Sequence, residues 1–278
     1  MMGSNLLLAS YPKSGNTWVR VFLVNLFANA REPLPLAEIG RLSTGDNVAA
    51  WYRAVDPGGE AAWNNARIAR LRHDVQRHVA GRSPDTVFLK THAALLPMEG
   101  VPPFAQDVLA GAVYIVRNPL DVAVSYARHS GVSLDGAIAT MERNNYTPGR
   151  FGELLPYLQG GWSQNVASWT MQVHPRIHVM RYEDMLADPP AAFANLTRFL
   201  EIDVPPERLE RAIANSDIAG LRRQEQEEGF TERPRQDVPF FGQGLVDAGR
   251  KSLNAEQIAR ICARHRAQMA RFGYLPEP

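Results

Sequence analysis

The sequence predicts an α/β protein, in which a central and mainly parallel sheet is flanked by helices within a single domain over residues 1–278. Three observations indicate this fold. Short apolar runs alternate with segments of helical periodicity along the whole chain. One run leads through a small polar loop directly into a helix. Basic residues follow the runs, and the carboxyl ends of parallel strands share the edge of a sheet where ligands bind.

Length and composition place the chain among ordinary globular proteins. Its 278 residues are 45% hydrophobic and 21% charged, which argues against disorder. The 30 basic and 29 acidic residues leave a net charge of +1, so neither nucleic acid nor a membrane is expected as a partner. The single cysteine, Cys262, excludes an internal disulfide, and we expect a protein of the reducing cytoplasm. An anionic ligand would need a local basic cluster.

A strand, a loop and a helix follow one another in residues 6–27. The apolar run 6–8 predicts a buried strand, and Val19 to Phe27 repeat apolar residues at the spacing of one helical face. The first amides and the dipole of this helix point into the polar loop 12–17 and attract an anion. Lys13 adds a positive charge. The alternative is an ordinary turn with a solvated lysine; the Walker pattern is absent, because this lysine precedes the glycine.

Three further strands are predicted, and each leads into polar or basic residues. They are Thr86–Leu89 followed by Lys90-Thr91-His92, Ala112–Val116 followed by Arg117, and Ile177–Met180 followed by Arg181-Tyr182. Asn118 is a good N-cap and Pro119 suits the first helical position, so a helix is expected directly after Arg117. That helix carries Ser125 about two turns in.

The segments between these elements carry weaker signals. We expect short helices and loops in 33–84, a mobile and loop-rich insertion in 130–165, and a surface loop or lid in 224–237. The segments 33–84, 130–165 and 224–250 are expected to act as acceptor-site insertions or lid loops. The aromatic residues of the first segment either pack it onto the domain or line an acceptor pocket. A last helix is predicted to begin at a capping box of Asn254 and Gln257.

Four motifs, in the same order, carry a family resemblance over roughly residues 5–190. The octamer YPKSGNTW resembles the 5′-phosphosulfate loop of sulfotransferases that use 3′-phosphoadenosine 5′-phosphosulfate (PAPS). KTH at 90–92, RNPLDVAVS at 117–125 and RYEDM from 181 are similar to further motifs of that family. The resemblance is strongest to the bacterial small-molecule and natural-product type. It implies a P-loop-like fold and sulfuryl transfer to an acceptor hydroxyl, with adenosine 3′,5′-bisphosphate (PAP) as product.

The resemblance assigns roles that also suit the chemistry of the side chains. His92 in its neutral form can accept the proton of a hydroxyl, while Lys13 and Lys90 can stabilise charge on the leaving phosphate without a metal ion. The residues expected at the donor are Lys13, Ser14, Gly15, Asn16, Thr17, Trp18, Arg117, Ser125, Tyr182, Ser216 and Gly244. The histidines show no ligand spacing with carboxylates or cysteines, so no metal site is predicted.

The C-terminal part of the chain departs from the family pattern RKGxxGxW. Here residues 240–251 read FFGQGLVDAGRK, with Gly242 and Gln243 where the basic pair would be and Gly249 in place of Trp. Gly244 is retained, and the positive charge at this position is either weakened or supplied by Arg250 or Lys251.

Two alternatives to a sulfotransferase remain open at this point. One is a nucleotide-dependent phosphoryl transferase on the same fold, and the other is a non-catalytic nucleotide-binding module. Neither the acceptor nor the oligomeric state can be read from the sequence.

Overall fold

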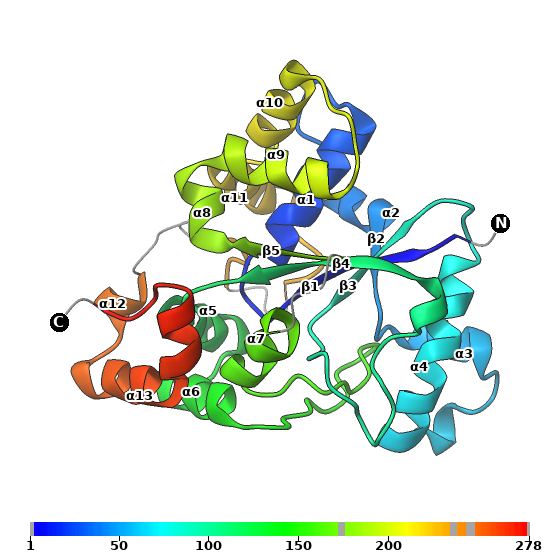
Figure 1. The fold of residues 1–278 in the computed structure, drawn as a ribbon, viewed down its shortest axis with the longest axis horizontal. Helices are drawn as coiled ribbons and strands as arrows, with labels where there is room; N and C mark the ends of the chain where they lie inside the picture. The colour runs from blue at the N-terminus through cyan, green and yellow to red at the C-terminus, as the bar shows by residue number, and fades with distance from the viewer. Residues whose placement is uncertain (1–2, 172–175, 234–237, 243–247, 277–278) are drawn as a thin grey trace. The chain divides into compact units, whose positions relative to one another are not determined.

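The computed structural model describes residues 3–171, 176–233, 238–242 and 248–276 (Figure 1). Its strands are β1 Asn5–Ser10, β2 Ser43–Gly45, β3 Val87–Thr91, β4 Leu109–Val116 and β5 Ile177–Arg181. Its α-helices are α1 Asn16–Ala28, α2 Ile39–Leu42, α3 Ala49–Val55, α4 Asn65–Ala80, α5 Pro119–Ser130, α6 Leu134–Glu142, α7 Trp162–Thr170, α8 Tyr182–Ala187, α9 Pro189–Phe199, α10 Pro206–Ala214, α11 Ile218–Glu228, α12 Ala248–Ser252 and α13 Ala255–Arg271. Short 3-10 turns are η1 Leu36–Glu38, η2 Glu60–Ala62 and η3 Gln106–Val108.

The five strands form one sheet in the order β2-β3-β1-β4-β5. Strand β1 pairs in parallel with β3, where Ala9 lies opposite Thr91, and β2 pairs in parallel with β3, where Gly45 lies opposite Lys90. Parallel neighbours need crossover connections, and helices supply them along the chain. The predicted α/β fold with a mainly parallel sheet flanked by helices is confirmed. The sequence missed β2, whose three residues are too few to show a period.

The chain forms two compact units. Unit 1 comprises Met1–Tyr11, Ser43–Tyr114 and Met141–Val179, and it includes β1, β2 and β3 with α3, α4 and α7. Unit 2 comprises Pro12–Leu42, Ile115–Thr140 and Met180–Pro278, and it includes α1, α5 and the helices after β5. Strands β4 and β5 contribute residues to both units. That residues 1–278 act as a single domain stays a prediction.

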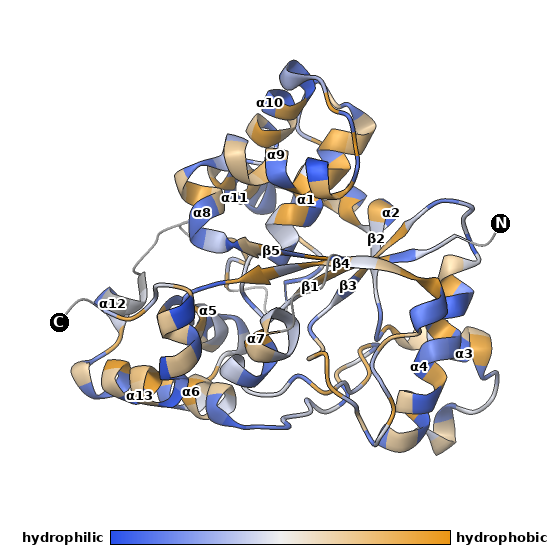
Figure 2. Cartoon of the chain, in the orientation of Figure 1, coloured by the Kyte–Doolittle hydropathy of each residue, from blue (hydrophilic) through white to orange (hydrophobic). Residues whose placement is uncertain are grey.

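Helix α1 corrects the predicted helical face. Every residue from Asn16 to Leu26 is buried, whereas Phe27, which the periodicity placed on the inner face, is 41% exposed. The reason is that α1 packs against both α2 and α10, so its burial is not confined to one stripe. Figure 2 shows the hydrophobic colouring of much of this helix.

Two other expectations about local structure are wrong. Segment 33–84 contains the 16-residue helix α4, whose N-cap Asn64 accepts from the amide of Arg67. Its buried face includes polar side chains such as Gln76, so the apolar residues do not recur at the helical spacing in the sequence. Residues 224–228, expected in a loop, belong to α11, and Glu225 is buried there. In contrast, the Asn118 cap of α5 and the capping box that opens α13 are confirmed.

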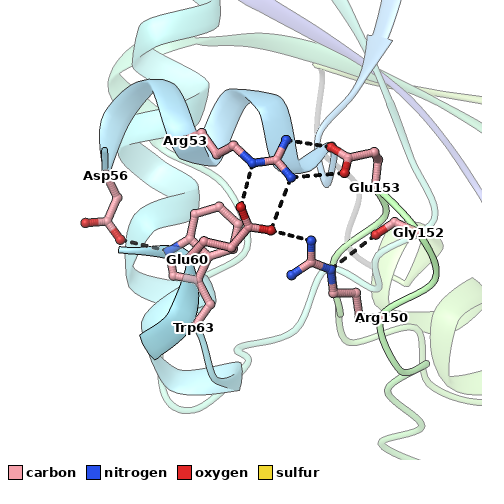
Figure 3. Close-up of polar contacts among 7 residues, drawn as sticks. All are labelled: Arg53, Asp56, Glu60, Trp63, Arg150, Gly152 and Glu153. Carbon is pink, nitrogen blue, oxygen red and sulfur yellow. Dashed lines mark hydrogen bonds and ion pairs between the residues drawn. The ribbon is translucent and has the colours of Figure 1, made fainter. Parts of the chain in front are cut away.

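Two of the segments predicted to be insertions are tied to each other within unit 1. Arg53 donates to Glu60 at 2.6 Å and to Glu153 at 2.7 Å, and Arg150 forms a further ion pair with Glu60 (Figure 3). The amide of Ala49 also donates to the carbonyl of Glu153 at 2.8 Å. The residues after β2 and the stretch before α7 therefore form one connected surface.

Candidate active site

The turn between β1 and α1 has an unusual backbone. Lys13 has a φ of 69° and Gly15 has a φ of 104°, both in the left-handed region. A Cβ on Gly15 would also lie 2.6 Å from the Tyr182 ring, so only glycine fits there. The amide of Trp18 donates back to the carbonyl of Gly15 at 3.0 Å. The first amides of α1 precede this bond and are the donors that a helix start offers to an anion.

The Lys13 side chain has two close neighbours in unit 2. Its Nζ lies 3.2 Å from Nδ1 of His129, which accepts from the ammonium, and 3.9 Å from the centroid of the Phe240 ring. Stacking of an ammonium on an aromatic face is favourable. The Lys13 side chain is therefore held in place by contacts with α5 and with Phe240.

Arg117 converges on the same turn from the end of β4. Its Nη1 donates to the backbone carbonyl of Lys13 at 3.1 Å, and its guanidinium lies 4.1 Å over the Tyr182 ring. Tyr182 in turn meets Trp18 edge to face at 5.7 Å. We call Lys13, Gly15, Trp18, Arg117 and Tyr182 the donor cluster. Burial raises the pKa of the Tyr182 phenol, and the guanidinium of Arg117 partly opposes this shift.

Three buried polar atoms around the donor cluster have no hydrogen-bond partner within the described part of the chain. They are Ser14 Oγ, Trp18 Nε1 and Arg117 Nε. Unpaired buried donors are rare because each costs about 1–3 kcal/mol. Together with two cationic side chains and a helix start, they suit a ligand that carries several anionic oxygens.

His92 follows the last residue of β3 and is oriented by β1. Its Nδ1 lies 2.8 Å from the carbonyl oxygen of Ser10 and 3.2 Å from that residue's hydroxyl. A carbonyl only accepts, so the neutral ring carries its proton on Nδ1. The lone pair is then on Nε2, as a general base requires.

The backbone of residues 90–93, which we call the KTH turn, is pinned by buried groups of unit 1. Thr91 donates to the carboxylate of Asp46 at 3.0 Å, and the Asp46 amide donates to the carbonyl of Lys90 at 3.1 Å. On the other side, Asn165 donates to the carbonyl of His92 at 3.1 Å. Burial raises the pKa of the Asp46 carboxyl, against the opposing effect of Arg72. The histidine is thus displayed on a rigid backbone.

The structure also describes most of the other residues that the sequence predicted at the donor. Asn16 and Thr17 are buried in the first turn of α1, and Ser125 is half-buried on α5. Ser216 lies two residues after the end of α10, and its hydroxyl donates to the carbonyl of Ala212 in that helix at 2.9 Å. Gly244 lies outside the described residues.

Sequence reasoning missed Asp46 and His129. Asp46 directly follows β2, so the rule that ligand-binding and catalytic groups follow strand ends would have found it had that strand been recognised. His129 is four residues after Ser125, which places the two on one face of α5.

The sheet and the helices that flank it define an α/β protein, and comparison with known proteins agrees with this fold. The sulfotransferase domain family matches residues 4–273, so the chain belongs to that family. It is 26% identical to sulfotransferase 1 family member D1 of Rattus norvegicus over 228 residues, which are 78% of this chain and 66% of the relative. The Mus musculus counterpart is 24% identical over 269 residues, 92% of this chain and 80% of the relative.

Solved structures show the same fold. Retinol dehydratase in complex with retinol and PAP superposes with a TM-score of 0.67 at 17% identity, covering 97% of this chain and 82% of the other. Mouse sulfotransferase SULT7A1 complexed with PAP gives a TM-score of 0.59 at 16% identity, with 96% and 85% covered. No helix among the described residues is long and apolar enough to cross a bilayer.

Proposed function

We propose that the chain transfers a sulfuryl group from PAPS to the hydroxyl of a small-molecule or natural-product acceptor and releases PAP. The observation that carries the proposal is the convergence of Lys13 and Arg117 on one turn, joined by the 3.1 Å hydrogen bond between them. Two cationic side chains from two strand ends suit a ligand with two separate anionic groups. Membership of the sulfotransferase family supports the proposal.

The donor cluster divides naturally between the parts of such a nucleotide. Lys13 and the first amides of α1 would hold the phosphosulfate, because that end of a helix favours negative charge. Arg117 with Ser125 would hold the 3′-phosphate, and the rings of Trp18 and Tyr182 offer flat surfaces for adenine. The unpaired atoms Ser14 Oγ, Trp18 Nε1 and Arg117 Nε fit this ligand.

His92 would act on the acceptor. Its Nε2 takes the proton of the acceptor hydroxyl as the bond from oxygen to sulfur forms and the bond from sulfur to the bridging oxygen breaks. Lys13 and Lys90 neutralise the charge that grows on the leaving phosphate. These residues need no metal for this step. The retinol bound with PAP in the retinol dehydratase complex supports a hydroxyl-bearing small molecule as the acceptor class.

The tied segments in Figure 3 belong to the ranges expected to shape the acceptor site. We propose them as part of its wall, while the acceptor within that class is left to experiment. The expected location in the cytoplasm stays a prediction.

The decisive experiment incubates the purified chain with each donor and a panel of phenols, alcohols and sugars. Sulfated product from PAPS, together with stabilisation of the protein by PAP, is expected. Transfer from ATP with Mg²⁺ and none from PAPS would favour a phosphoryl transferase. PAP binding with no transfer to any acceptor, and no effect of His92→Ala, would favour a binding module.

A further inference from the structure

Arg128 occupies the space in front of Gly242. The arginine lies on α5, three residues after Ser125, and a Cβ built on Gly242 would lie 2.9 Å from its Nη2. Gly242 stands at one of the two positions where the family pattern RKGxxGxW has a basic residue. The guanidinium of Arg128 thus lies where the side chain of residue 242 would begin.

Arg128 also belongs to a group of like charges. Its partial burial lowers its pKa, and the nearby charges of Arg117 and Arg222 lower it further. Among the described residues, neither Arg128 nor Arg222 forms an ion pair with a carboxylate. The negative charge of Glu225 has the opposite effect and raises the pKa of Arg128.

The carboxylate of Glu225 is already engaged. It pairs with Arg233 at 2.7 Å, accepts from the amide of Phe241 at 3.0 Å and accepts from the amide of Phe240 as well. The positive charges of Arg117, Arg128 and Arg222 therefore repel one another. A polyanion bound among them would relieve that repulsion.

We infer that Arg128 binds the 3′-phosphate of the donor together with Arg117, and that it replaces a basic side chain at position 242 by reaching the same place from helix α5. The inference rests on the proposed function and names a residue that lies outside the four sequence motifs. It predicts that the contribution of Arg128 depends on the 3′-phosphate and can be moved to residue 242.

Calorimetric titration of the full chain with PAP and with adenosine 5′-monophosphate tests the inference. Arg128→Ala should weaken PAP binding about 10- to 150-fold, the range for a hydrogen bond to a charged group. The affinity for adenosine 5′-monophosphate should change by no more than about twofold. Arg223→Ala removes a neighbouring exposed arginine and is the matched control, expected to bind both ligands like the unaltered chain. Gly242→Arg combined with Arg128→Ala should recover most of the lost PAP affinity.

The outcomes distinguish the role of Arg128 from the proposed function. Equal weakening of both ligands by Arg128→Ala, no weakening of either, or no recovery in the double variant would overturn the role of Arg128 while leaving the sulfotransferase proposal intact. Failure of the unaltered chain to bind PAP would overturn the proposed function and this inference with it. A circular dichroism spectrum of each variant confirms that it is folded.

Discussion

Arg117 and Lys13 are joined by a hydrogen bond of 3.1 Å from the guanidinium of the first to the backbone carbonyl of the second. The bond fixes the carbonyl at the residue whose φ is 69°, so it holds the turn in a conformation that a lysine rarely adopts. Arg117 therefore has two tasks, to shape the turn and to present positive charge. A lysine could present the charge but not both contacts.

Arg117→Lys is accordingly expected to weaken PAP binding about tenfold or more, because it loses the planar fork that donates to Lys13 and stacks on Tyr182. Calorimetric titration with PAP measures the effect. Arg198→Lys, at an exposed position on α9, is the control. Unchanged affinity in Arg117→Lys would show that only the charge at this position counts.

His92→Ala is expected to lower turnover about 100- to 10,000-fold while PAP affinity stays within about twofold, because the role proposed for the imidazole is to accept the proton of the acceptor hydroxyl and not to bind the nucleotide. Single-turnover sulfation and PAP titration separate the two quantities. The exposed His78 on α4 provides the matched control, His78→Ala. A parallel loss of turnover and PAP affinity would instead place His92 in the nucleotide site.

Thr91→Val tests the support of the KTH turn. The substitution keeps the shape but removes the hydroxyl that donates to Asp46 at 3.0 Å and accepts from the amide of Ala93 at 3.1 Å, so the free energy of unfolding should fall by about 1–3 kcal/mol. Thr91→Ser retains the hydroxyl and should recover much of that difference. Urea denaturation followed by circular dichroism measures both variants. Equal stability of Thr91→Val and the unaltered chain would mean that the hydrogen bonds of the Thr91 hydroxyl contribute nothing to stability.

Glu60→Gln tests the charge network of Figure 3 through its pH dependence. Hydrogen bonds from Arg53 and then Arg150 lower the pKa of Glu60 from 4.5 to about 2. A carboxyl with a lowered folded-state pKa stabilises the protein above its unfolded-state pKa, and this contribution is lost as the pH falls from about 4.5 to about 2. The melting temperature of the variant should therefore be lower than that of the unaltered chain at pH 7. The difference between the two melting temperatures should disappear as the pH falls over that acidic range.

The control for this prediction is Asp203→Asn, since Asp203 is exposed and forms no ion pair among the residues that the structure describes. Its melting temperature should follow that of the unaltered chain at every pH. A gap for Glu60→Gln that persists unchanged down to the acid end of that range would show that the network stabilises through packing and not through charge.

Local signals predicted the elements that position the candidate site. The runs at 6–8 and 112–116 and the Asn118 cap depend on neighbours in sequence, so β1, β4 and α5 could be found from them. The missed features depend on distant residues. Three-residue β2 exists because it pairs with β3, and the burial of Asp46 follows from that pairing.

The contacts among side chains at the candidate site were equally hidden. The sequence placed Lys13 and Arg117 after two strands, but it contained no sign that one donates to the other's carbonyl or that His129 receives the lysine ammonium. Tertiary packing decides such contacts, and periodicity carries no information about them.

The Phe240 ring contacts the Lys13 ammonium, and this contact links anion binding at the turn to a part of the chain more than 200 residues away in sequence. Any anion that draws the ammonium away from Phe240 gives up a cation–π contact worth about 0.5–2 kcal/mol, so the affinity measured for that anion is lower by the same amount. By thermodynamic reciprocity, a bound anion loosens the anchorage of the Phe240 segment to the same degree. Binding of the nucleotide and release of Phe240 from the Lys13 ammonium are thus thermodynamically linked.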